Sequence, residues 1–510
     1  MSAYTITGCR ALLGEAMTCS DGAVDLFVRD GRIDRILPAG SAPPEGAVID
    51  GRQRLAAPGL VNGHHHSHEH FHKGRYDRLP LELWMNFVRP MRPLELTPRD
   101  VYLRTMIGAI QALRSGTTCL MDDMNASPVL HRDHVEAAYQ AYEDVGIRAL
   151  MGMTLFDKPF FESVPYVEDE FPPELLVRLR GTQATPPAEM LAYARELARS
   201  RHPREHRVGY LATPSAPQRC TEGFLREVRA FADEYDLPTV IHVQETRMQV
   251  VTGQLFYGST MVEYLDRIGF LKPATSLIHA VWLTPDEIAT IARSGASVQH
   301  NPNSNFKLGS GLAPLRALLD AGVNVSLGTD GCGSIETLDM LRVVANTALV
   351  HKLRGDDHTR WIGAEEAWHA GTVGGARALG MGDRLGTLEV GCEADFVLYR
   401  LDGIAFTPLN DPLRQLVYAE TGSAIDSVFV AGEPVVRGGE LAKVNEAALN
   451  DEIAEAAERI RPQIAASEAM VGEMSAAYAR IHARCACHPI SPDTYAVRLP
   501  DGPDLRKSPR

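Results

Sequence analysis

Histidine is concentrated in one short segment, PGLVNGHHHSHEHFH at residues 58–72, which carries six of the chain's 18 histidines. His64 and His66 follow the apolar run GLVNG. Alternate residues at the end of a strand point the same way, so these two imidazoles can bind one ion while His65 points away. The segment therefore predicts a metal site at the end of a strand.

Other side chains able to bind a metal follow separate apolar runs. His242 comes after TVI, Glu245 three residues later, His279 after SLI and Asp330 after VSLGT. One histidine near a strand end is usually a hydrogen-bonded structural residue. Without Glu245, five such residues lie on four strands, and this favours a shared site. Three histidines and a carboxylate suit Zn²⁺ or Fe²⁺ and leave a position for water, whose pKa then falls toward 7. The pattern predicts hydrolytic chemistry.

The elements that must position these residues alternate between apolar strands and amphipathic helices. Seven strands, together with the one entering PGLVNG, make eight, which predicts an α/β fold of the (β/α)8 TIM-barrel type over residues 58–380. The seven are TTCLMDD, RALMGMTL, VGYLATP, TVIHVQE, SLIHAVW, ASVQHNP and NVSLGTD. A barrel of this kind collects its active-site residues at the carboxyl ends of its strands.

Both ends of the chain read differently from its middle. Residues 1–57 contain short strands around turns, as in VDLFVRDGRIDRILP, and residues 381–446 return to that pattern. We expect the two parts to build one small β-sandwich domain. Residues 447–510 predict a C-terminal helix followed by a tail.

Composition excludes several classes of protein. The 510 residues have a formal net charge of −14, which disfavours nucleic acid as a partner. No apolar run reaches the roughly 18 residues of a membrane span, and the start of the chain lacks the pattern of a secretory signal, so we expect a cytoplasmic protein with no membrane partner. The eight cysteines are scattered, which indicates reduced thiols. The CACH sequence at residues 485–488 is either an accidental cluster or a metal site.

Five segments resemble, in order, the barrel motifs of the amidohydrolase superfamily, in its branch of cytosine, guanine and S-adenosylhomocysteine deaminases and s-triazine hydrolases. They are PGLVNGHHH, HVQET, IHAVWLT, HNPNSN and LGTDG. The resemblance implies that His64, His66, His242 and Asp330 bind one divalent ion. It also implies that His279 positions or polarises the attacking water and that Glu245 shuttles the proton, which makes Glu245, His279 and Asp330 the catalytic residues.

The fourth strand helps to choose the number of ions. Binuclear relatives carry a bridging lysine there, whereas this strand reads VGYLATPSAP and has none. One ion is therefore expected. Zn²⁺ is favoured, and Fe²⁺ and Mn²⁺ remain alternatives, since three histidines and an aspartate serve all of them.

The loop after the first strand forms one wall of the substrate pocket in this family. His68 and Glu69 are expected to face the pocket because they follow the ligands most closely. The next stretch, KGRYDRLPLELWM, also resembles the family's loop, and its Trp84 is either a pocket wall or a core anchor.

The chain departs from adenosine-type deaminases at two places. Those enzymes hold the ribose with a glutamate soon after this tryptophan, but here the stretch is VRPMRPLE, with Arg89 and Arg92. They place a histidine in the fourth-strand motif, where this chain has Ser215. Both departures argue against a nucleoside substrate. Arg92 could bind a carbonyl or carboxylate, or both arginines could be surface ion-pair partners. Trp282, where a second histidine is often found, adds aromatic lining.

The leading hypothesis is a metal-dependent hydrolase that deaminates a small cyclic amidine or heteroaromatic compound, such as a purine, pyrimidine, pterin or triazine. Hydrolysis of an amide, urea or carbamate C–N bond by the same mononuclear site is the alternative, and dehalogenation is a third variant. A binding protein that has lost catalysis would not need all six site residues. The accessory sandwich and the C-terminal helix offer surfaces for a homo-oligomer.

Overall fold

Parallel β-structure forms the centre of the fold. The computed structural model describes residues 3–89 and 94–495, apart from the side chain of Glu473. One parallel sheet contains β7 (Leu60–His65), β8 (Thr117–Met124), β9 (Arg148–Leu155), β10 (Val208–Tyr210) and β11 (Thr213–Pro214). The other contains β12 (Thr239–Val243), β13 (Thr275–His279), β14 (Ser297–His300) and β15 (Val325–Leu327). Every strand that the sequence predicts in the middle of the chain is present.

The edges of the two parallel sheets contact each other on both sides. On one side the amide of His242 donates to the carbonyl of Ser215 at 3.0 Å. On the other, the amide of Asp330 donates to the carbonyl of His64 at 2.9 Å. The predicted α/β class with parallel strands is confirmed, and these bonds bring the carboxyl ends of β7, β12 and β15 to one place.

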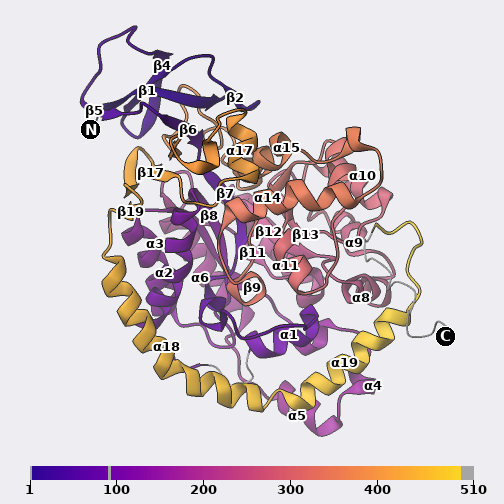
Figure 1. Cartoon of the computed structure of the whole chain (residues 1–510). Coiled ribbons are helices and arrows are strands. Elements are labelled where there is room, and N and C mark those ends of the chain that lie inside the picture. The colour runs from indigo at the N-terminus through magenta and orange to yellow at the C-terminus, as the bar shows by residue number, and fades with distance from the viewer. Residues whose placement is uncertain (1–2, 90–93, 496–510) are drawn as a thin grey trace, which may run out of the picture.

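Helices between the strands cover the outside of the parallel sheets (Figure 1). In α10 the start and end are encoded locally: Thr284 and Glu287 cap each other's backbone amides, and Gly295 ends the helix with φ of 72°. Its apolar residues Ile288 and Ile291 are buried. The helices of this layer are α2 (Pro98–Arg114), α3 (Arg132–Val145), α6 (Pro187–Ser200), α7 (Glu222–Glu234), α9 (Met261–Arg267), α10 (Pro285–Ser294), α12 (Leu315–Asp320) and α14 (Met340–Val350).

Short helices occupy many of the connections. Those that follow parallel strands are η1 (Ser67–His72), α1 (Leu81–Val88), η2 (Phe160–Ser163), α4 (Val167–Glu170), α5 (Pro173–Arg180), η3 (Pro217–Arg219), α8 (Arg247–Tyr257), α11 (Pro302–Lys307) and α13 (Cys332–Ile335). Farther along the chain are η4 (His351–Leu353), η5 (His358–Arg360), α15 (Ala364–His369), η6 (Ala370–Gly374), α16 (Gly375–Ala378), η7 (Ile404–Phe406) and α17 (Pro412–Tyr418).

Strands from both ends of the chain form one ten-stranded sheet, in which β6 pairs antiparallel with β16 and Ala56 lies opposite Leu398. The predicted hairpin between β3 and β4 is present, and Asp30 and Gly31 turn it with φ of 51° and 79°, as a tight two-residue turn requires. The strands are β1 (Ala3–Leu13), β2 (Thr18–Cys19), β3 (Val24–Arg29), β4 (Arg32–Pro38), β5 (Ala47–Asp50), β6 (Arg54–Pro58), β16 (Phe396–Arg400), β17 (Ile425–Val430), β18 (Glu433–Arg437) and β19 (Glu440–Leu441).

A buried ion pair joins the ten-stranded sheet to the parallel strands. Arg148, at the start of β9, donates from Nε to Asp395 Oδ2 at 3.0 Å and from Nη2 to Asp395 Oδ1 at 3.0 Å. The same guanidinium bonds to Glu393. Asp395 also accepts the amide of Ala431 at 2.7 Å, so one carboxylate connects β9 with the connection between β17 and β18.

The C-terminal segment is two helices where the sequence predicts one. α18 (Glu446–Ala469) packs on α2, and α19 (Gly472–Cys487) packs on α1 and α8. Figure 1 shows them curving around the outside of the molecule. A continuous straight helix would leave this surface, so the break between them, next to Gly472, lets the chain follow it. Cys485 is buried and Cys487 is exposed, so the two thiols of the CACH sequence point to different surroundings. Among the described helices, none is long and apolar enough to cross a membrane.

Candidate metal centre

Four side chains predicted as metal ligands converge where the two parallel sheets meet. His64 and His66 come from β7, His242 from β12, and Asp330 follows β15. One carboxylate oxygen of Asp330 lies 3.4 Å from Nε2 of His64 and 3.5 Å from Nε2 of His66. Ligand atoms of His64, His66 and His242 lie within 4.8 Å of one another. The spacing suits a single ion held between them.

The hydrogen bonds of the three histidines test whether a metal fits. Nδ1 of His66 is 2.7 Å from the carbonyl of Asp123, and Nδ1 of His242 is 2.8 Å from that of Ser215. A carbonyl can only accept, so each Nδ1 carries the proton and each Nε2 keeps a free lone pair. Neither ring nitrogen of the buried His64 has a hydrogen-bond partner among the described residues. A divalent ion would satisfy one nitrogen of each of the three rings, so the site fits a metal.

His279 is held differently from the three histidines above. The side-chain amide nitrogens of Asn301 and Asn305 lie 3.4 and 3.1 Å from its Nδ1. An amide that donates to Nδ1 leaves the proton on Nε2. That Nε2 lies 3.5 Å from Oε2 of Glu245 and 3.9 Å from Oδ2 of Asp330. His279 therefore presents a donor to two carboxylates.

The backbone is strained where the strands deliver these residues. Gln244, His279 and Asp330 adopt φ of 47°, 71° and 67°, in the left-handed region that costs residues other than glycine about 1 kcal/mol or more. Asp330 is fixed there by the hydroxyl of Ser304, which donates to Oδ2 at 2.6 Å, and by the amide of Gly331, which donates to Oδ1 at 2.8 Å. Such strain is typical of functional sites.

The two carboxyl groups at the centre are pushed in opposite directions. Burial would raise the pKa of Asp330, but the interaction with His64 and the charges of the neighbouring histidines outweigh burial and hold that pKa well below its usual value. Burial, followed by repulsion from Asp330, Glu82 and Glu69, raises the pKa of Glu245 well above its usual value. A pair with such different affinities for a proton can divide the roles of ionised ligand and proton carrier.

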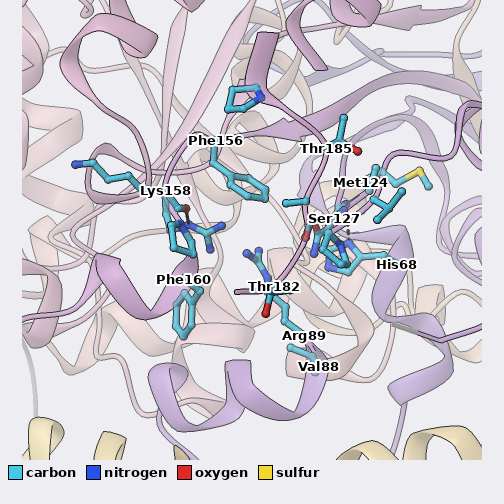
Figure 2. A pocket seen from close by; sticks show the side chains of 18 of the residues that line it. His68, Val88, Arg89, Met124, Ser127, Phe156, Lys158, Phe160, Thr182 and Thr185 are labelled. Carbon is cyan, nitrogen blue, oxygen red and sulfur yellow. Dashed lines mark hydrogen bonds between the residues drawn. The ribbon is translucent and has the colours of Figure 1, made fainter. Parts of the chain in front are cut away.

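One cavity adjoins the centre, and a second, larger one shares three of its lining residues. The inner chamber, of about 60 Å³, is lined by His66, His242, Glu245, His279 and Asp330. The outer cavity, of about 910 Å³, is shown in Figure 2. Arg89, Phe160 and Arg219 line both, so they stand at the junction.

The structure separates the residues proposed as substrate contacts. Glu69 and Trp84 line the inner chamber, and His68 lines the outer cavity. Trp84 is also a core residue, because it is buried with Val88 and its indole N–H donates to the carbonyl of Gly333 at 3.2 Å. Trp282 is not among the residues that line either cavity. Arg92 lies outside the described residues.

Two other histidines of the opening segment, His65 and His70, are held by contacts away from the metal ligands. Nε2 of His65 is 3.2 Å from the hydroxyl of Tyr142, and its ring stacks on His70 with centroids 5.7 Å apart. Nδ1 of His70 is 2.7 Å from the carbonyl of Arg104. His65 and His70 therefore face away from the metal ligands, on the other side of the strand.

Sequence reasoning did not identify Arg219 or the anchoring role of Ser304. Arg219 stands in TPSAPQRCT, four residues after Ser215, and its charge in a strand-end loop was the available signal. Ser304 stands in the HNPNSN motif, but the motif does not show that its hydroxyl reaches Asp330, a contact that forms because α11 packs next to α13.

The amidohydrolase family profile matches residues 55–435, and the chain belongs to that family. Two curated relatives are a 5-methylthioadenosine/S-adenosylhomocysteine deaminase of Pyrococcus furiosus and a 5'-deoxyadenosine deaminase of Methanothermobacter thermautotrophicus. The first is 33% identical over 428 residues, covering 84% of this chain and 94% of the relative. The second is 33% identical over 432 residues, covering 85% and 93%. The resemblance read from the motifs is confirmed.

Solved structures agree with this assignment. An adenosine deaminase from Xanthomonas campestris with bound zinc has a TM-score of 0.79 at 30% identity, covering 90% of this chain and 98% of its own. An atrazine chlorohydrolase from Arthrobacter aurescens complexed with zinc has a TM-score of 0.79 at 23% identity, covering 89% and 99%. The second likeness concerns the fold alone.

Proposed function

We propose that this chain is a metal-dependent aminohydrolase that replaces the amino group of a small cyclic amidine or heteroaromatic compound by oxygen. The observation that carries the proposal is the convergence of His64, His66, His242 and Asp330 beside His279 and Glu245, at the wall of a small chamber. Relatives at 33% identity that are named as deaminases support the same reaction class. The reaction consumes one water and releases one ammonia.

The proposed ion is a single Zn²⁺ bound through Nε2 of His64, His66 and His242 and a carboxylate oxygen of Asp330. When bound, such an ion supplies a water acidic enough to act as a nucleophile at neutral pH. Zinc in two structurally similar proteins supports its choice here. The carbonyls of Asp123 and Ser215 would orient two of the ligands.

The proposed proton path uses Glu245, His279 and the ligand Asp330. Glu245, whose raised pKa favours a protonated carboxyl, protonates a ring nitrogen as water adds to the carbon that bears the amino group. Asp330 accepts one proton of the water. Glu245, now ionised, takes the remaining hydroxyl proton of the adduct and delivers it to the leaving amine, and the proton held by Asp330 then returns Glu245 to its protonated state. His279, with Nε2 3.5 Å from Glu245 and 3.9 Å from Asp330, would orient the attacking oxygen between them.

Product analysis by mass spectrometry tests the proposal. The zinc-loaded protein is incubated with aminopurines, aminopyrimidines, pterins, triazines, ureas and amides, together with 5'-deoxyadenosine, 5-methylthioadenosine and S-adenosylhomocysteine. A gain of about one mass unit with release of ammonia, as expected when OH replaces NH₂, supports a deaminase. A split carbon skeleton would overturn it in favour of amide or urea hydrolysis.

Metal analysis of the same preparation tests the stoichiometry. We expect one zinc per chain and loss of activity after chelation, with recovery when zinc is returned. Two ions per chain at full activity would contradict the mononuclear site. Manganese or iron that restores a higher rate than zinc would change the identity of the ion only.

The proposal extends to the architecture. We propose that the eight parallel strands form a closed (β/α)8 barrel over residues 58–380 and that residues 1–57 and 381–446 form the accessory sandwich. We also propose a cytoplasmic homo-oligomer. Leu353, Ile404 and Tyr418, which are exposed on η4, η7 and α17, supply a candidate apolar surface for association. Light scattering would test it, and a mass equal to one chain at micromolar concentration would contradict it.

A further inference from the structure

The outer cavity carries a charge opposite to that of the whole chain. The formal net charge of the chain is −14. Five arginine or lysine side chains nevertheless line the cavity, against two carboxylates. Both carboxylates are already engaged, because Asp157 accepts the amide of Thr221 at 2.7 Å and Glu162 pairs with Arg180 at 3.5 Å. The outer cavity is therefore electropositive, although the protein as a whole is acidic.

Arg89 and Arg219 lie at the junction between the outer cavity and the inner chamber, since each lines both. Figure 2 shows Arg89 extending from the end of α1 into the outer cavity, between Phe156 and Phe160 on one side and His68 on the other. The Arg89 guanidinium makes no hydrogen bond or ion pair with any residue that the structure describes.

Arg219 is held in place but is not neutralised. Its Nε donates to the carbonyl of Lys158 at 3.1 Å, and its guanidinium lies 4.3 Å from the ring centre of Phe156. No carboxylate within the described ranges lies within ion-pair distance of it. Burial, and then the positive charge of Arg89, lower the pKa of Arg219 to about 9. The side chain is still charged at neutral pH, and it is 5% exposed.

The two carboxylates whose charges act on Arg89, those of Asp123 and Glu69, already accept hydrogen bonds from other groups. Glu69 accepts the amide of Gly333 at 3.2 Å, and burial raises its pKa to about 7. Asp123 accepts the hydroxyl of Thr154 at 2.7 Å. Arg219 is buried and Arg89 is half-buried. Removing water from a cation without an anionic partner is costly, so two such arginines at one junction indicate that the missing anion arrives with a ligand.

We propose that Arg89 and Arg219 form an oxyanion subsite that selects substrates carrying a carboxylate or phosphate beside the ring that loses its amino group. The inference rests on the proposed deamination and names its substrate class. The amino-bearing ring enters the inner chamber, and the anionic group stays at the junction, where planar guanidinium groups can each donate two hydrogen bonds to it. Neutral heterocycles lack this contact and react more slowly.

Substrate pairs that differ in charge test the subsite, and in the carboxylate pairs the shape hardly changes. The first pairs are the 6-carboxylate and 6-carboxamide of pterin and the 5'-carboxylate and 5'-carboxamide of adenosine. Adenosine 5'-monophosphate and adenosine form the phosphate arm. With the zinc-loaded protein we expect kcat/KM for at least one acid to exceed that of its neutral partner by roughly tenfold to a hundredfold. Which arm shows the preference distinguishes carboxylate from phosphate.

Variants locate the preference. Arg89→Met and Arg219→Met should each lower kcat/KM for the acid more than for the neutral partner, so that the ratio of the two falls toward one. Arg89→Lys should restore part of the preference. Arg180→Met is the matched control, because this exposed arginine lines the same outer cavity but pairs with Glu168, and its preference should equal that of wild type. Arg219→Met loses its contact with Phe156 and could fail to fold. In that case Arg89→Met alone still tests the subsite.

Two results separate this inference from the proposed function. If neutral and acidic partners are deaminated equally and the variants do not discriminate, the subsite is overturned and deamination stands. If nothing is deaminated, thermal shift with the same pairs decides: stabilisation by the acids alone, lost in Arg89→Met, supports the subsite while deamination falls, and equal shifts overturn the subsite as well.

Discussion

Replacing Glu245 by glutamine removes one proton carrier and little else. The side chain is 2% exposed and its Oε1 has no hydrogen-bond partner among the described residues, so an amide of the same shape fits without a cavity. Its Oε2 lies 3.5 Å from Nε2 of His279. General acid–base catalysis is worth about 10²–10⁴-fold, so at about 1.36 kcal/mol per tenfold the variant should lose about 2.7–5.4 kcal/mol of transition-state stabilisation.

The folding stability of Glu245→Gln should rise or stay the same, although its activity falls. Because the pKa of Glu245 is raised in the folded state, the folded protein binds this proton more tightly than the unfolded chain does. The group therefore costs stability at pH values above the ordinary pKa of a glutamate, and a neutral amide removes that cost. We expect the melting temperature of metal-free Glu245→Gln to equal or exceed that of wild type.

The assay combines kcat/KM for the best deaminated substrate, zinc content and thermal unfolding. Glu82→Gln is the matched control, since Glu82 is a buried carboxylate on α1 that accepts the hydroxyl of Thr246 and does not line the inner chamber. Its kcat/KM should stay within about tenfold of wild type. Wild-type turnover in Glu245→Gln would refute the proton-carrier role, and loss of zinc in that variant would make Glu245 a ligand.

Three further changes test other parts of the structure. Asp330→Asn should lower zinc content or leave a bound ion without turnover, because the carboxylate faces both His64 and His66; an active, zinc-loaded variant would contradict its role. His65→Ala should keep its zinc but lose about 1–3 kcal/mol of unfolding free energy, since it removes a buried ring that contacts Tyr142, and zinc loss would place His65 among the ligands. Asp395→Asn should destabilise the chain by about 3–5 kcal/mol in denaturant titration by leaving the buried Arg148 with a weakened partner, whereas a change under about 1 kcal/mol would show that the pair is dispensable.

The sequence alone identified the parallel strands and the residues at their ends. Apolar runs such as TVI and SLI end directly before His242 and His279, and the strand period places His64 and His66 on one face. These are local properties, set by side-chain alternation within a few residues, so they can be read without knowing the fold. The family motifs then gave an order to the same residues.

Tertiary structure decided what lies beside those strand ends. Trp282 follows a strand just as the ligands do, yet it donates to the carbonyl of Ser310 and lines neither cavity. Arg219 and Arg89 are 130 positions apart in the chain and meet only because η3 and α1 border the same cavities. Contacts between distant segments depend on how loops pack in three dimensions, and no spacing in the sequence records that packing. The residues of the metal centre could therefore be predicted from the sequence, whereas the residues that surround its substrate could be found only in the structure.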